Sequence, residues 1–117
     1  MRLASAWATT TNWSPATVPT TTVDCTIGSA NSIPALAANV SCRNTTFQSG
    51  GTLNFASSTF ELATYAALQV SSGFTFQNAT TGTLALRGST NQSINLSTAF
   101  PGNLIVAPTV GTVTESV

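Results

Sequence analysis

Short apolar-x-apolar triplets recur along the second half of the chain. Their first residues are 7, 8, 6, 10, 10 and 10 positions apart, and turn-forming Gly, Pro, Ser and Asn residues lie between them. This alternation is typical of short strands with one buried face, and no stretch sustains a helical period. The pattern predicts an all-β chain. The triplets are Leu53–Phe55, Phe60–Leu62, Leu68–Val70, Phe74–Phe76, Leu84–Leu86, Ile94–Leu96 and Leu104–Val106.

Two architectures accommodate many short strands at this spacing: a β-sandwich of hairpins, and a parallel β-solenoid in which three short strands make one coil. The triplets are shorter than usual sandwich strands. The chain also contains no Asn-Gly or Asp-Gly pair, which is the strongest hairpin signal. We therefore expect the solenoid, with the β-sandwich as the alternative. The side chains expected to point inward are Leu53, Phe55, Leu68, Val70, Leu84, Leu86, Ile94, Leu96 and Leu104.

The chain of 117 residues is long enough for one domain. Residues 7–22 hold both Trp residues, two of the five Pro residues and a run of Thr, and do not share the triplet pattern. We expect an N-terminal cap over residues 1–22 and the β-solenoid over 23–106. Residues 107–117 are expected to form a C-terminal tail or an intersubunit strand.

The composition is almost without charge. Only six residues are charged, Lys and His are absent, and Thr, Ser and Asn together supply 45 residues. Three scattered Arg residues cannot form the basic patch that nucleic-acid binding needs. No apolar run approaches the ~20 residues that cross a bilayer. We therefore expect neither a nucleic-acid partner nor membrane insertion.

Two cysteines, Cys25 and Cys42, lie 17 positions apart in the β-prone segments 23–27 and 40–44. In an oxidising compartment they would pair, and a loop of this size is worth ~3 kcal/mol in the chain-entropy model. The alternative is two buried thiols that act as small hydrophobic side chains. The hydroxyl-rich composition favours the disulfide.

A set of motifs follows in a fixed order along the chain: Trp7…Asn12-Trp13-Ser14-Pro15, Gly50-Gly51-Thr52-Leu53, Gly82-Thr83-Leu84 and Gly88…Gln92-Ser93-Ile94. This order resembles a module found in large bacterial surface and secreted proteins with parallel β-helix repeats, often from bacteria that use type IX secretion. The likeness spans residues 7–106 and implies a right-handed β-helix in an extracellular or cell-surface protein. The chain departs from the module because it lacks the usual acidic and Lys content. The resemblance carries over no catalytic residues.

The chemistry-bearing residues are few. A nucleophilic triad lacks His, and a Ser-Lys pair lacks Lys. The three acids, Asp24, Glu61 and Glu115, are dispersed, which gives little support to a glycosidase pair or a calcium site. We expect no catalytic residues, no metal and no cofactor, and the protein is not expected to be an enzyme.

Three aromatic residues, Trp7, Trp13 and Tyr65, form a candidate glycan-contact platform. The alternative for the two Trp residues is that they plug the open end of the solenoid core, which must be covered. Glycans are therefore a possible partner.

The expected function is a self-assembling structural role in a surface layer, stalk or filament. Solenoid ends expose unpaired strand edges, which natural proteins usually protect with charge, Pro or bulges. The C-terminal stretch offers only Glu115 as a charge, and its candidate self-association residues are Val106, Val110, Val113 and Val117. The alternative function is an adhesin segment or a glycan-binding module of a larger surface protein.

Overall fold

The computed structural model of the chain describes residues 18–28, 35–89, 92–106 and 113–116, and all regular structure within them is β-strand. No helix in these ranges is long and apolar enough to cross a membrane. The strands are β1 (Cys25–Ile27), β2 (Val40–Cys42), β3 (Thr45–Phe47), β4 (Thr52–Asn54), β5 (Glu61–Thr64), β6 (Leu68–Val70), β7 (Thr75–Gln77), β8 (Thr83–Leu86), β9 (Gln92–Leu96), β10 (Asn103–Val106) and β11 (Val113–Ser116).

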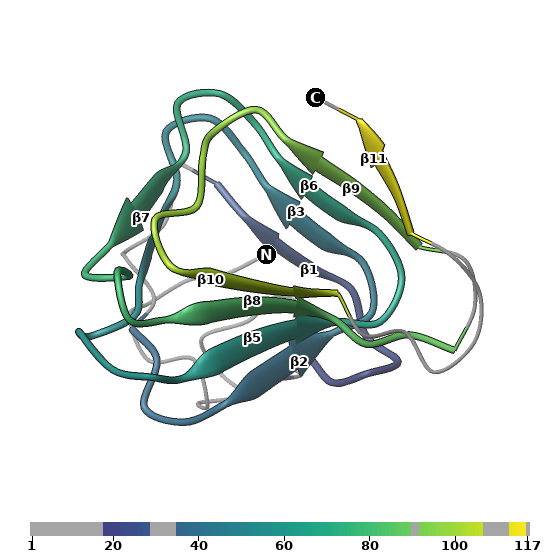
Figure 1. Cartoon of the computed structure of the whole chain (residues 1–117), viewed down its shortest axis with the longest axis horizontal. Helices are drawn as coiled ribbons and strands as arrows, with labels where there is room; N and C mark the ends of the chain where they lie inside the picture. Colours follow the sequence, from purple (N-terminus) through teal and green to yellow (C-terminus); the bar gives the residue numbers. More distant parts are fainter. Residues whose placement is uncertain (1–17, 29–34, 90–91, 107–112, 117) are drawn as a thin grey trace.

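The strands form three sheets that enclose a triangular core (Figure 1). The five-stranded sheet has the order β1-β3-β6-β9-β11, the four-stranded sheet has the order β10-β8-β5-β2, and the two-stranded sheet is β4-β7. Every pairing between these strands is parallel. The fold is therefore the predicted β-solenoid, of about three turns, and the antiparallel hairpins of a β-sandwich are absent from the described strands.

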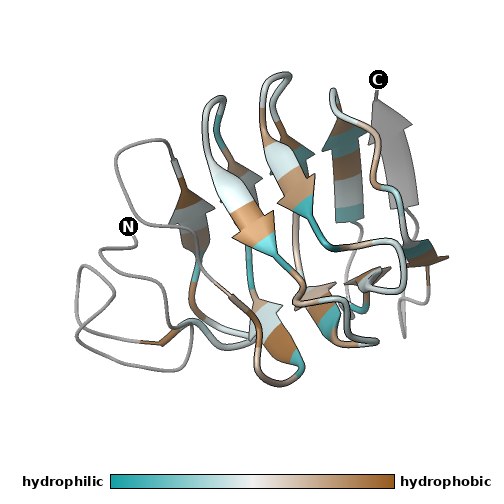
Figure 2. Cartoon of the chain, turned by 90° about the vertical axis from the view of Figure 1, so that its left-hand side faces the viewer, coloured by the Kyte–Doolittle hydropathy of each residue, from teal (hydrophilic) through white to brown (hydrophobic). Residues whose placement is uncertain are grey.

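Successive coils run β2-β3-β4, β5-β6-β7, β8-β9 and β10-β11, so each adds a strand to the four- and five-stranded sheets, and the first two also add one to the two-stranded sheet. In the four-stranded sheet, Val40, Leu62, Leu84 and Leu104 are consecutive partners, so one coil takes 20 to 22 residues. Figure 1 shows the chain winding counterclockwise, and Figure 2 shows the coils side by side between the N-terminal and C-terminal ends. The winding is right-handed, as parallel crossovers nearly always are.

The core follows the predicted alternation. Seven of the nine expected inward side chains are at most 3% exposed, and Leu96 is partly buried against the core. Leu104 contradicts the prediction that it is buried, because it is 46% exposed. It pairs in register with Leu84 but belongs to β10, the last strand of its sheet, so no described strand lies beyond it.

One corner of the core is aromatic. The rings of Phe47 and Phe74 stack with their centroids 4.5 Å apart, and Phe76 meets Phe74 and Phe100 edge to face at 5.1 and 4.8 Å. Such contacts add to the energy of burying the rings. The adjoining turns are tight: the φ angles of Gly50 and Gly73 are 83° and 85°, values that favour glycine. These corners place the next coil directly over the last.

The C-terminal strand is part of the same molecule's sheet. β11 pairs with β9, with Val113 opposite Gln92 and Glu115 opposite Ile94. The regular structure thus continues past residue 106, the predicted end of the solenoid. Residues 113–116 pair inside the chain, so an intersubunit contact would have to use the other edge of β11.

Candidate functional site

The predicted glycan platform is only partly covered by the structure. Trp7 and Trp13 lie outside the described residues. Tyr65 directly follows β5 and is partly buried. The structure therefore describes only one of the three rings, and the glycan platform stays a prediction.

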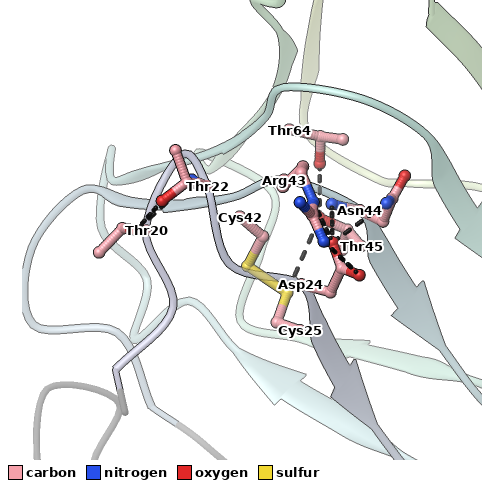
Figure 3. The surroundings of a disulfide bond; sticks show 9 residues. All are labelled: Thr20, Thr22, Asp24, Cys25, Cys42, Arg43, Asn44, Thr45 and Thr64. Atoms are coloured by element: carbon pink, nitrogen blue, oxygen red, sulfur yellow. Dashed lines mark hydrogen bonds and ion pairs between the residues drawn. A yellow bond between two sulfur atoms is a disulfide. The ribbon is translucent and has the colours of Figure 1, made fainter.

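The first acid, Asp24, is held by an arginine from the next coil (Figure 3). Arg43 donates from Nε and Nη2 to the two carboxylate oxygens at 2.8 and 3.1 Å, and the backbone and side-chain nitrogens of Asn44 each donate to Oδ1 at 3.0 Å. The Arg43 hydrogen bond lowers the pKa of the Asp24 carboxyl to about 2. Because the carboxylate accepts four hydrogen bonds, it acts as a clamp between the first two coils.

The second acid, Glu61, forms a similar pair with Arg87. Arg87 donates from Nε and Nη2 at 2.7 and 2.8 Å, and this bonding raises the pKa of the guanidinium. Glu61 begins β5 and Arg87 follows β8, so the pair crosses the outer face of the four-stranded sheet over the partners Ala63 and Ala85. These alanines are 3% and 1% exposed although they face away from the core. The ion pair therefore spans a row of small, buried positions on the outer face of this sheet.

The disulfide joins Cys25 and Cys42, which confirms the predicted pairing. Their Cα atoms are 5.8 Å apart and both residues are buried. The bond ties the start of the five-stranded sheet to the start of the four-stranded sheet. Figure 3 shows it beside the hydroxyl of Thr45, which lies 2.7 Å from the hydroxyl of Thr64 in the core.

The buried amide of Gln92 bonds to the backbone at Thr64, whose hydroxyl faces that of Thr45. Its Nε2 donates to the carbonyl oxygens of Thr64 and Ala66, both at 2.9 Å, and its Oε1 accepts from the backbone N–H of Gly88. The hydrogen bonds offset the cost of burying polar groups. This polar corner is structural, because its groups are occupied with one another.

The exposed apolar residues gather on one strand. Among the described residues, the large hydrophobic side chains that are exposed are Leu104, Ile105 and Val106, at 46%, 36% and 53%. All three belong to β10, which pairs with β8 on one edge. The C-terminal end of the four-stranded sheet thus combines a strand edge that no described strand pairs with and an apolar surface.

An apolar cleft of about 440 Å³ lies at the opposite end of the molecule. One wall is residues 18–21, and the other is Ala35 with residues 37–41, which reach the first two residues of β2. The chain turns at the first wall, where the N–H of Val23 donates to the carbonyl of Thr20 at 3.1 Å, so no described strand covers β2 there. The cleft is at the N-terminal end of the four-stranded sheet.

The predicted self-association residues are placed only in part. Val106 is exposed on β10, and Val113 starts β11, whereas Val110 and Val117 lie outside the described residues. Sequence reasoning missed Ile105 and the cleft. Ile105 stands out only once the register is known, because its partners at the outward position are Ala85, Ala63 and Ser41, which are all small. The cleft had no signal in the sequence, because it depends on where the chain turns away from β2.

No family model, no curated protein and no solved structure matches the chain. The β-solenoid and the disulfide rest on the structure alone. The resemblance to bacterial surface modules therefore rests on the order of motifs in the sequence alone.

Proposed function

We propose that this protein is a non-catalytic structural subunit of an extracellular or cell-surface assembly, and that it associates with other copies through the C-terminal end of its solenoid. The observation that carries the proposal is the apolar edge strand β10, with Leu104, Ile105 and Val106 all exposed. Strand edges of this kind are templates for pairing with another chain, unless charge or Pro protects them.

The charges support the same proposal. Asp24, Arg43, Glu61 and Arg87 are the charged residues whose side chains the structure describes, and each is bonded to an opposite charge. None of the four lies on β10, so no described charge opposes the approach of a second apolar edge there. The motif order that resembles bacterial β-helix surface modules supports the extracellular placement. The disulfide also favours an oxidising compartment.

The test is the oligomeric state of the whole protein and of one edge variant. We expect the full chain to form larger species as concentration rises in sedimentation velocity. Val106→Lys should weaken this association roughly a hundredfold or more, because burying an unpaired ammonium group costs several kcal/mol.

Gln69→Lys is the matched control, since Gln69 is exposed in β6, which lies in the middle of its sheet. It should associate like the unmodified protein. A full chain that stays monomeric at every concentration contradicts the proposal. The role would then revert to a segment of a larger surface protein or an adhesin, for which a glycan array is the next measurement.

A further inference from the structure

The two ends of the solenoid differ in strand order and in apolar surface, and the two surfaces fit one another. The five-stranded sheet starts one coil earlier, at β1, whereas the four-stranded sheet starts at β2. The apolar cleft lies at this N-terminal end beside β2, and the apolar strand β10 lies at the C-terminal end of the same sheet. We infer that the surface that covers β10 is the N-terminal end of a second copy, so that association is head to tail. This inference rests on the proposed function.

The strand order fixes how two such copies fit. β10 and β11 belong to the last coil, and β1 belongs to the coil before β2 and β3. Placing β2 of the second copy directly on β10 would put its β1 where β11 already lies. The second copy must therefore sit one coil further along, with its β1 beside β11 and a gap of one strand position between β10 and its β2.

Residues 18–21 and the cleft of the second copy occupy that one-strand gap. Val23, just after the wall segment, accepts a hydrogen bond from the N–H of Arg43, just after β2, at 2.9 Å. The wall segment is therefore at the level of a first-coil strand of the four-stranded sheet. Leu104 and Val106 would contact this segment and the mouth of the cleft, where the partly buried Val18 and the exposed Ala37 and Ala38 supply apolar surface.

The size of the ends is sufficient for a stable contact. The molecule measures 34 by 26 Å across the view of Figure 1, which looks along the solenoid axis. An end of that size offers roughly 700 Å² per copy, and specific interfaces bury about 800 Å² per partner. Because the two contacting surfaces differ, the contact does not close on itself, and repeated contacts give open filaments.

The experiment mixes two variants, each blocked at one end. Val106→Lys blocks the C-terminal end, and Ala38→Lys blocks the cleft at an exposed position. In a head-to-tail contact each variant alone stays monomeric, because neither offers both surfaces. An equimolar mixture forms a one-to-one dimer that grows no further, because one intact end of each variant remains. Sedimentation velocity distinguishes these species.

Two results would overturn the head-to-tail contact while leaving self-association intact. One is dimer formation by Ala38→Lys alone, which indicates a tail-to-tail contact between two β10 strands. The other is a mixture that stays monomeric although the unmodified protein associates. A monomeric unmodified protein would instead contradict the proposed function itself. Thermal unfolding checks that both variants fold, and Leu104→Lys with Thr20→Lys repeats the mixing with a second pair.

Discussion

Leu84 and Leu104 are partners in the same inward column, yet Leu84 is 0% exposed and Leu104 is 46% exposed. The difference is not one of residue type or of register. Leu84 has a described strand on each side, β5 and β10, whereas Leu104 has β8 on one side only. In a solenoid each coil contacts only its neighbours, so alternation decides which way a side chain points and the adjacent coils decide whether it is buried.

The two ends of the molecule differ in how they are fastened. The N-terminal end is fastened by the Cys25–Cys42 disulfide and the Asp24–Arg43 ion pair. The C-terminal end has no such fastening among the described residues of β10, and its apolar side chains are exposed. We therefore expect the free energy of unfolding to depend on where the chain is altered: in an interior coil, at the fastened N-terminal end or at the exposed C-terminal end.

The largest difference is expected from a matched pair of core truncations. Leu84→Ala should lower the free energy of unfolding by ~2–5 kcal/mol, because it leaves a cavity in a packed interior. Leu104→Ala removes a side chain that is nearly half exposed and should cost about 1 kcal/mol or less in the monomer. Urea unfolding of both variants at low protein concentration measures the two values. Equal losses would show that the last coil is covered in solution as the interior coils are.

A smaller effect is expected from opening the disulfide at the fastened end. Reduction should lower the free energy of unfolding by about 3 kcal/mol, the chain-entropy value for a loop of about 15 residues. Hydrogen exchange should localise the change: the amides of β1 should exchange faster relative to those of β6, since β1 is the edge strand that the bond holds. Equal acceleration in both strands would mean that the bond stabilises the whole solenoid at once.

The smallest effect is expected from Asp24→Asn. Since the pKa of Asp24 is lowered from 3.8 to about 2 in the folded protein, the ionised carboxylate stabilises the fold above about pH 4. That contribution is lost as pH falls toward 2. The variant should therefore be less stable than the unmodified protein at pH 7 and nearly as stable at pH 2. Because both side chains of the pair are about half exposed, the difference is small.

Arg43→Gln provides the control for this measurement, because it removes the group that lowers the pKa of Asp24 most and leaves the carboxyl and its Asn44 hydrogen bonds in place. It should remove most of the same pH dependence. A stability difference for Asp24→Asn that persists unchanged at pH 2 would assign the effect to packing and not to charge.

The fold was predictable because a solenoid repeats one local rule. The triplet centred on Gln69 alternates, which is enough to orient its side chains. The shortness of the triplets and the absence of a two-residue hairpin signal then favour the solenoid over a sandwich. The ends could not be predicted in the same way. The exposure of Leu104 depends on which strands lie beside it, and the cleft depends on a turn at Thr20. Both are properties of chain routing, which alternation does not encode.

The two bonded ion pairs also affect how the protein responds to its solvent. Dissolved salt screens interactions between exposed charges, with a Debye length of about 10 Å at 0.1 M. A surface made mainly of hydroxyl and amide groups has few such interactions to screen. Folding and end contacts that depend on apolar burial do not weaken in concentrated salt, and excluded salts such as sulfate strengthen them. The protein should therefore hold the same structure in dilute buffer and in brine.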